Sequence, residues 1–124
     1  MLPQRKQRIA FSQGFWWYHH PKRNLVIKLD PLFAKCGWSV GSLCILIGAE
    51  KRTFARVVEE SIGITGKAWL CRLRAVAAGH LLREGDEITF VADQLGFRHN
   101  SDFASEFKKQ VGVSPSSYVN GVQH

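Results

Sequence analysis

The stretch SVGSLCILIG at residues 39–48 recurs as EITFVADQLG at residues 87–96, and this repeat decides the fold. Both copies place apolar side chains at matching positions, namely Val40 and Ile88, Leu43 and Val91, and Ile47 and Leu95. Each copy holds a small residue at its centre and ends in a glycine. A short helix, a glycine turn and a second helix, used twice, form the pattern of tandem helix-turn-helix units.

The match continues beyond the glycines. After one inserted residue, Phe54 stands opposite Phe103, and the sequence IGIT at residues 62–65 stands opposite VGVS at residues 111–114. We therefore predict helix-turn-helix units at about 39–61 and 87–110, joined by a linker helix over about 66–82. Further short helices are expected over about 31–35 and from Pro115 onward. The prediction for residues 30–122 is all-α.

Polar residues mark where these helices begin. Asp30, Ser39, Thr65 and Ser114 each precede an apolar-periodic segment and are predicted N-caps. Gly48 is predicted to end the first short helix in a left-handed conformation. Within the linker helix, the spacing predicts one apolar stripe, made of Trp69, Leu73, Val76, Ala77 and Leu81.

Residues 1–29 lack a helical period and are predicted to form an N-terminal basic and aromatic arm. The arm contains the cluster FWWY at residues 15–18 and the strand-like segment Leu25–Leu29, so it could be a strand or an arm packed on the domain. Residues 1–28 hold six basic and no acidic side chains, namely Arg5, Lys6, Arg8, Lys22, Arg23 and Lys28. Such a segment predicts a sequence-independent, salt-sensitive contribution to binding a polyanion.

The net charge of +7 likewise favours a polyanionic partner, but residues 29–124 hold eleven basic and ten acidic side chains, so their basic surface must come from local clusters.

Three cysteines without a C-x-x-C pair argue against a disulfide framework, and Cys44 is predicted to be a small buried side chain. No catalytic or metal-ligand spacing appears, so we expect no enzyme, no metal and no cofactor. A DNA-repair methyltransferase would need a zinc–cysteine cluster, which this sequence lacks, and Cys36 alone is weak evidence for that activity. No apolar run is long enough to span a membrane, which predicts a cytoplasmic protein.

The second helix of the first unit offers basic side chains opposite its buried positions Phe54, Val57 and Val58. The candidate DNA-binding residues there are Lys51, Arg52, Thr53 and Arg56. A helix of this kind fits the major groove of double-stranded DNA, where an arginine fork pairs with guanine or grips phosphate.

The second unit offers a weaker set of candidates. These are Arg98, His99, Asn100, Ser101, Ser105, Lys108 and Lys109. Asn100 could read adenine, and Arg98 or His99 could hold a phosphate. Asp102 and Glu106, however, are expected to put negative charge on or near the same surface. Few base contacts and a positioning role are therefore an equally good interpretation of this helix.

The two units, the linker helix and the closing GVSPSSY at residues 112–118 resemble the AraC/XylS family of bacterial transcription regulators. The stretch VADQLGF at residues 91–97, with Phe103 and the FKK of residues 107–109, resembles that family's second unit. The likeness covers about residues 31–121. It implies a seven-helix domain whose two recognition helices enter successive major grooves. The base-reading positions it implies are Arg52, Ala55, Arg56, Asn100, Ser101 and Ser105.

Ser105 stands where the family often carries arginine, so the first recognition helix is predicted to dominate specificity. Only about 30 residues precede the likeness, too few for the family's usual sensor, so a free-standing DNA-binding domain with no evident small-molecule effector is expected. RNA polymerase is a further candidate partner. The alternative hypothesis is a protein-binding adaptor that keeps the fold but has lost base reading.

Overall fold

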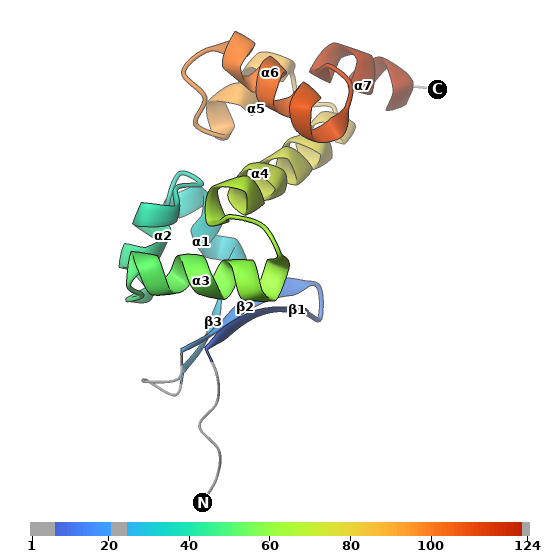
Figure 1. Ribbon diagram of the computed structural model, residues 1–124. Helices are drawn as coiled ribbons and strands as arrows, with labels where there is room; N and C mark the ends of the chain where they lie inside the picture. The colour runs from blue at the N-terminus through green and yellow to red at the C-terminus, as the bar shows by residue number, and fades with distance from the viewer. Residues whose placement is uncertain (1–6, 21–24, 123–124) are drawn as a thin grey trace, which may run out of the picture. The chain divides into compact units, whose positions relative to one another are not determined.

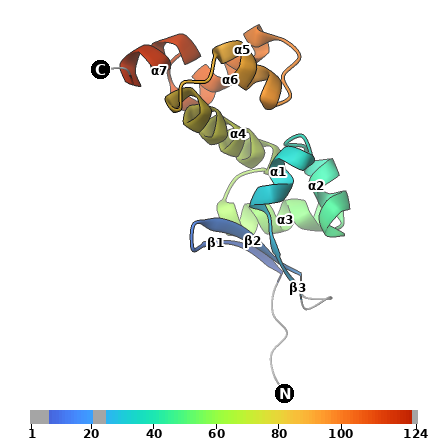
Figure 2. The same cartoon turned by 180° about the vertical axis from the view of Figure 1, so that it is seen from behind.

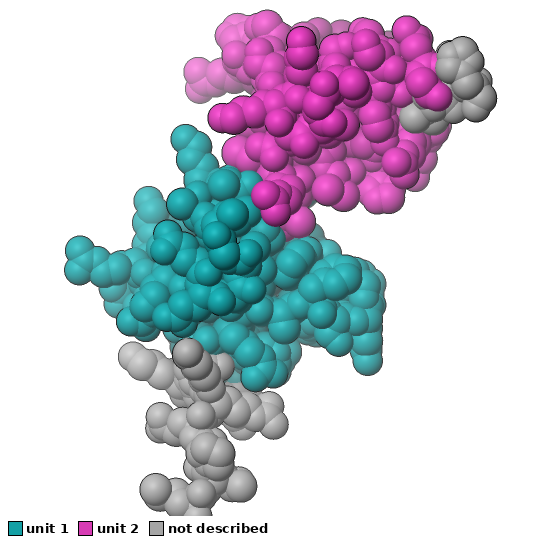
Figure 3. Space-filling view, turned by 45° about the vertical axis from the view of Figure 1, so that its right-hand side comes forward, with its two compact units in different colours: residues 1–70 teal, residues 71–124 magenta. Residues whose placement is uncertain are grey.

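The computed structural model describes residues 7–20 and 25–122, which form three strands followed by seven helices (Figure 1). The strands are β1 (Arg8–Ser12), β2 (Phe15–His20) and β3 (Leu25–Lys28). The helices are α1 (Asp30–Lys35), α2 (Val40–Ile47), α3 (Lys51–Ile62), α4 (Gly66–Arg83), α5 (Ile88–Gln94), α6 (Asn100–Val111) and α7 (Pro115–Val122). The chain divides into two compact units, residues 1–70 and residues 71–124, which we call unit 1 and unit 2 (Figure 3).

The strands form one antiparallel sheet in the order β1-β2-β3. A tight turn at Gln13 and Gly14, both with positive φ, joins β1 to β2, as hairpin turns commonly do. In the pairing, Tyr18 lies opposite Ile9 on one side and Ile27 on the other. Figure 1 and Figure 2 both show this sheet lying against α3. The all-α prediction for residues 30–122 is confirmed, and the sheet is an addition to it.

Helix α1 forms as expected, but the prediction that Asp30 caps it is wrong. Asp30 lies inside the helix, and Leu29 occupies the cap position without a side-chain hydrogen bond. The Asp30 carboxylate instead accepts a hydrogen bond of 2.6 Å from the backbone N–H of Trp16. The carboxylate therefore joins α1 to β2, because it satisfies a backbone N–H group of the sheet instead of one at the start of the helix.

Helices α2 and α3 match their predicted positions within two residues. The Ser39 side chain accepts a hydrogen bond of 3.4 Å from the backbone N–H of Ser42, and Gly48 has a φ of 69°, so both predicted ends of α2 are confirmed. Helix α3 buries Phe54, Val57 and Val58 as predicted. The turn between the two helices thus fixes one face of α3 against the core of unit 1.

Helix α4 begins as predicted, with Thr65 accepting a hydrogen bond of 3.1 Å from the N–H of Ala68. The predicted apolar stripe is wrong in part, because Val76 is 54% exposed. The side chains that α4 buries are Trp69, Leu70, Ala75, Ala78 and Leu82. Trp69 and Leu70 belong to unit 1 and the other three to unit 2, so two different cores, rather than one continuous stripe, determine which side chains are buried.

Unit 2 has an aromatic core. The rings of Phe103 and Phe107 lie 5.7 Å apart, and Phe107 meets Tyr118 of α7 edge to face at 5.3 Å. Ser114 caps α7 as predicted, because its side chain accepts a hydrogen bond of 3.1 Å from the N–H of Ser117. This core holds α6 and α7 together.

Candidate nucleic-acid interface

Helix α3 presents a basic face to solvent. Lys51, Arg52 and Arg56 are exposed, and Ala55 is exposed between them, whereas Thr53 is half-buried. The N-cap residue Glu50 makes no side-chain cap hydrogen bond. The first backbone N–H groups of α3 and its first two cations therefore lie at the same end of the helix, which is a favourable place for a phosphate.

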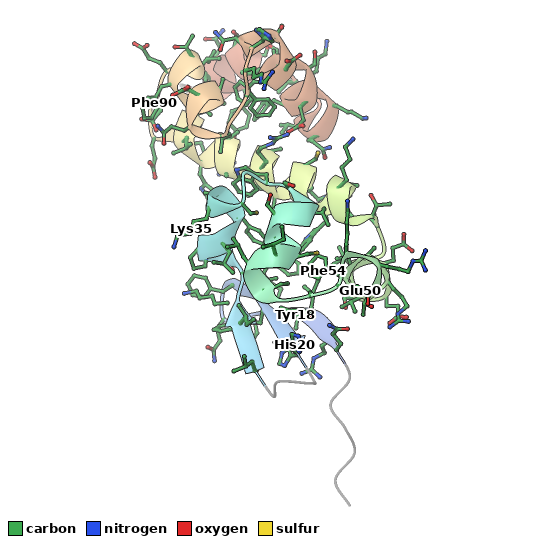
Figure 4. The ribbon with its side chains drawn as sticks, turned by 90° about the vertical axis from the view of Figure 1, so that its left-hand side faces the viewer. Tyr18, His20, Lys35, Glu50, Phe54 and Phe90 are labelled. Atoms are coloured by element: carbon green, nitrogen blue, oxygen red, sulfur yellow. The ribbon has the colours of Figure 1, made fainter. Side chains whose placement is uncertain are left out.

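The sheet supports α3 from its buried side. The Tyr18 ring is fully buried and meets the Phe54 ring at 5.8 Å, and the backbone N–H of Ile9 donates to Ser61 Oγ at 3.1 Å. His20 Nε2 lies 3.4 Å from the carbonyl oxygen of Gly48 in the α2–α3 turn. Figure 4 shows Tyr18 and His20 on the sheet beside this turn. Helix α3 is thus held by β1 and β2 as well as by α2.

Burial also raises the pKa of two side chains in unit 1, Tyr18 and Cys44. Burial raises the pKa of the Tyr18 phenol above its ordinary value of 10.0, although a hydrogen bond from Gln7 acts in the opposite direction. Burial likewise raises the pKa of the Cys44 thiol above 9.0, and the nearby charge of Lys51 lowers it in part. Cys44 is 3% exposed, which confirms the prediction of a small buried side chain.

Glu60 forms an ion pair with the basic face of α3. Arg56 Nε is 4.0 Å from Glu60 Oε1, and the two side chains are 69% and 47% exposed. An exposed pair at this distance is weak, so Arg56 remains able to reorient toward another anion.

Helix α6 places its predicted residues at its N-terminal end and along its exposed side. Arg98 is exposed in the turn before α6, and His99 occupies the N-cap position with extended backbone and no side-chain cap hydrogen bond. The exposed predicted residues on the helix itself are Asn100, Ser101, Ser105, Lys108 and Lys109. Asp102 is exposed in the first turn as well. Unit 2 thus carries a more polar and less basic candidate surface than unit 1.

The expectation that Glu106 adds negative charge to this surface is wrong. Glu106 accepts two hydrogen bonds from Arg74 of α4, at 2.9 Å from Nε and 2.6 Å from Nη2. Arg74 in turn lies over the Phe97 ring at 4.1 Å. The pair is largely buried, with side chains 18% and 21% exposed, so the carboxylate is neutralised between α4 and α6. Sequence spacing could not show this pairing, because the partner lies 32 residues away.

Four of the six N-terminal cations, Arg5, Lys6, Lys22 and Arg23, lie outside the described residues. Of the other two, Arg8 is exposed on β1, whereas Lys28 lies over the Phe15 ring at 3.5 Å. Lys28 therefore already contacts an aromatic face within the sheet.

Across residues 7–20 and 25–122, no group of three or more His, Cys, Asp or Glu side chains could hold a metal ion. Cys36 is buried and donates to the Phe33 carbonyl at 3.1 Å. Within the same described part of the chain, none of the helices is both long and apolar enough to cross a bilayer.

Comparison with known proteins gives consistent matches. A family described as a helix-turn-helix domain matches residues 43–121. Over 71 residues the chain is 37% identical to the HTH-type transcriptional activator RhaS of Escherichia fergusonii, which covers 56% of this chain and 26% of RhaS. Over 105 residues it is 28% identical to the RCS-specific HTH-type transcriptional activator RclR of Escherichia coli, which covers 84% of this chain and 37% of RclR. The chain thus spans well under half the length of these relatives.

Among solved structures, the chain resembles the DNA-binding domain of AdpA, described as a global transcriptional factor and solved in complex with a target DNA. The TM-score is 0.65 at 26% identity, over 75% of this chain and 87% of that one. It also resembles the C-terminal domain of AraT, a response regulator from Geobacillus stearothermophilus, with a TM-score of 0.65 at 23% identity over 73% and 79% of the two chains. At that identity the second likeness concerns the fold alone.

Proposed function

The chain belongs to the AraC/XylS family of helix-turn-helix transcription regulators, and we propose that it is a non-enzymatic regulator that reads double-stranded DNA by placing α3 and α6 in successive major grooves. Residues 30–124 are proposed as the DNA-binding domain. The observation that carries the proposal is the exposed face of α3, where Arg52 and Arg56 stand opposite a buried apolar side and Lys51 is exposed in the first turn.

The chemistry of this face fits the major groove. The groove admits one α-helix, whose N-terminal residues reach the base edges. Arg52 and Arg56 lie four positions apart and so share one side of the helix. Each guanidinium can pair with the O6 and N7 atoms of guanine, while Lys51 and the free amides at the start of α3 suit a phosphate. Ala55, small and exposed between the arginines, leaves room for close approach to the bases.

We propose a different division of work for α6. Its base-reading candidates, Asn100, Ser101 and Ser105, are short and uncharged, and Asp102 lies exposed beside them. Arg98, Lys108 and Lys109 supply the cations for phosphate. Helix α3 would then dominate specificity, and α6 would mainly position the domain on the duplex.

Two observations favour DNA reading over the protein-binding adaptor. The domain of AdpA that this chain resembles was solved on a target DNA. Glu106, one of the two acidic residues of α6, pairs with Arg74 instead of standing free on the surface. Since RhaS and RclR are named transcriptional activators, we also propose that this chain regulates transcription and that RNA polymerase is a partner.

The test starts with selection of bound duplexes from a random DNA pool, followed by fluorescence anisotropy on the selected site. Arg52→Ala and Arg56→Ala should each weaken specific binding by about 1–3 kcal/mol, or roughly 5- to 150-fold. Lys35→Ala is the matched control, because Lys35 is an exposed cation at the end of α1, outside both recognition helices (Figure 4). If both arginine variants bind as tightly as the control variant, the proposal fails.

A second substitution separates base reading from phosphate contact. Arg52→Lys keeps the charge but removes the planar fork that pairs with guanine. If Arg52 reads a base, the lysine variant should lose discrimination at one or two positions of the selected site while its affinity for unrelated duplex stays unchanged. Equal loss on both duplexes would instead assign Arg52 to phosphate.

A further inference from the structure

Unit 2 contains a groove of about 270 Å³ between α4, the C-terminal part of α6, and α7. None of the residues that line it is assigned above to DNA. The residues that line it are Arg72, Ala75, Val76, Gly79, His80, Arg83, Phe107, Gln110, Val111 and Tyr118. All ten belong to unit 2, so the groove is complete within one compact unit.

Helix α4 supplies one wall as a regular stripe. Arg72, Val76, His80 and Arg83 follow one another at intervals of four, four and three residues, which places them on one side of the helix. The two arginines are eleven positions apart, or roughly 16 Å along the helix axis at 1.5 Å per residue. The wall is therefore cationic at both ends and has an aliphatic side chain between them.

The floor of the groove is apolar and partly open to solvent. Ala75 and Phe107 are buried beneath it, while Val76 and Val111 remain 54% and 40% exposed. Gly79 permits the close approach of α7, since a Cβ at this position would lie 3.2 Å from the Tyr118 hydroxyl oxygen. Exposed aliphatic side chains beside a closely packed floor favour an apolar partner.

None of these ten described lining residues is acidic. The nearest acid on α6 in the sequence, Glu106, is paired with Arg74. The charged side chains that line the groove are therefore Arg72 and Arg83, and His80 lies between them on α4. A partner that fills the groove must bring negative charge near both ends and apolar side chains in the middle.

We propose that this groove docks an acidic amphipathic helix of a partner protein, laid along α4. Helices commonly bind grooves through apolar anchors spaced at i, i+4 and i+7. A cavity of 270 Å³ is smaller than the roughly 300–1,000 Å³ of most small-molecule sites, and two arginines roughly 16 Å apart are too distant to share one small anion. A docked helix can place one carboxylate near Arg72 and another near Arg83 at the same time.

The groove and two of the DNA-binding candidates, Ser101 and Ser105, occupy different sides of α6. Ser101 and Gln110 are nine positions apart, which at about 100° per residue places them on opposite sides of the helix. Phe107, Gln110 and Val111 line the groove, whereas Ser101 and Ser105 belong to the proposed DNA face. The two partners therefore need not compete for the same surface of this helix.

The test pans the full chain against a phage library of alanine-rich helical peptides, randomised at positions i, i+4, i+7 and i+11. The expected result is enrichment of Asp or Glu at the two outer positions and of large apolar residues at the two inner ones. In anisotropy titrations, an enriched peptide should bind the Arg72→Gln/Arg83→Gln variant at least about tenfold more weakly than the parent chain. Val76→Asp should weaken binding similarly.

The matched control is Lys35→Gln/Lys67→Gln, which removes the same charge at exposed positions outside the groove. This control should bind the peptide like the parent chain. Both double variants should keep the parent melting temperature by circular dichroism and bind the selected DNA equally well, so failure here is distinct from failure of DNA binding. Absence of enrichment, enrichment of basic or uncharged peptides, or equal weakening by both double variants would overturn the proposal.

Discussion

The ion pair between Arg74 of α4 and Glu106 of α6 allows a quantitative test of how unit 2 is held together. The perturbation is a double-mutant cycle with Arg74→Ala, Glu106→Ala and the two combined. The coupling energy of the cycle isolates the pair from the packing that each substitution also removes. Arg74 additionally lies 4.1 Å from the centre of the Phe97 ring, so Arg74→Ala should cost more than Glu106→Ala.

The magnitude follows from geometry and burial. Two charge-assisted hydrogen bonds of 2.6 and 2.9 Å join the side chains. Removing one partner from a fully buried pair costs about 3–5 kcal/mol, whereas an exposed pair contributes about 0–1 kcal/mol. With side chains 18% and 21% exposed, the pair lies between these limits but closer to the buried one. We therefore expect a coupling energy of roughly 2 kcal/mol for unfolding in urea.

The natural control is the Arg56–Glu60 pair of α3, at 4.0 Å with side chains 69% and 47% exposed. The same cycle there should give at most about 0.5 kcal/mol. Unfolding is best followed by far-UV circular dichroism, because all four tryptophans lie in unit 1 and their fluorescence does not report on unit 2. A coupling energy for Arg74 and Glu106 no larger than that of the control pair would refute the reasoning.

Two further predictions concern the buried core of unit 1. Tyr18→Ala should destabilise unit 1 by about 3–5 kcal/mol, since the fully buried ring packs on Phe54. Phe15→Ala should cost far less, because Phe15 is 40% exposed. Tryptophan fluorescence during unfolding in urea measures both changes. Burial raises the pKa of Cys44 and Tyr18 above 9.0 and 10.0, so the unfolded chain releases these protons first. The stability that these two groups contribute is present below pH 9 and should be lost as the pH rises through their folded pKa values. Urea titrations between pH 7 and 10.5 measure this loss, and Cys44→Ala should reduce it. A loss of stability in this variant equal to that of the parent chain would contradict the assignment to Cys44.

Helix positions and helix caps followed from local sequence, because their causes are local. The left-handed Gly48, the Ser39 and Thr65 caps and the buried side of α3 each depend on residues within one or two turns. The exposed positions of Arg52 and Arg56 followed from the same periodicity. The exception is Asp30, whose carboxylate bonds to Trp16, fourteen residues earlier in the chain.

Features that depend on distant partners could not be predicted in this way. The run of four aromatic residues at 15–18 conceals the alternation that identifies a strand, so the β1–β2 hairpin was not predicted. The exposure of Val76 reflects the change of core along α4, and the burial of Glu106 depends on Arg74. In each case, burial depends on contacts between side chains that are far apart in sequence. The periodicity of apolar residues within one segment carries no information about such contacts.

The sheet that supports α3 also has a consequence for synthesis of the chain. The Ile9–Ser61 hydrogen bond spans 52 residues, so β1 and β2 leave the ribosome long before the helix on which they pack. At about 5–20 residues per second, the interval is roughly 3–10 s. An isolated hairpin is only marginally stable and exposes unpaired edges during that time. Unit 1 can therefore complete its fold only after residue 61 has emerged, and α3 then packs against strands that were made several seconds earlier.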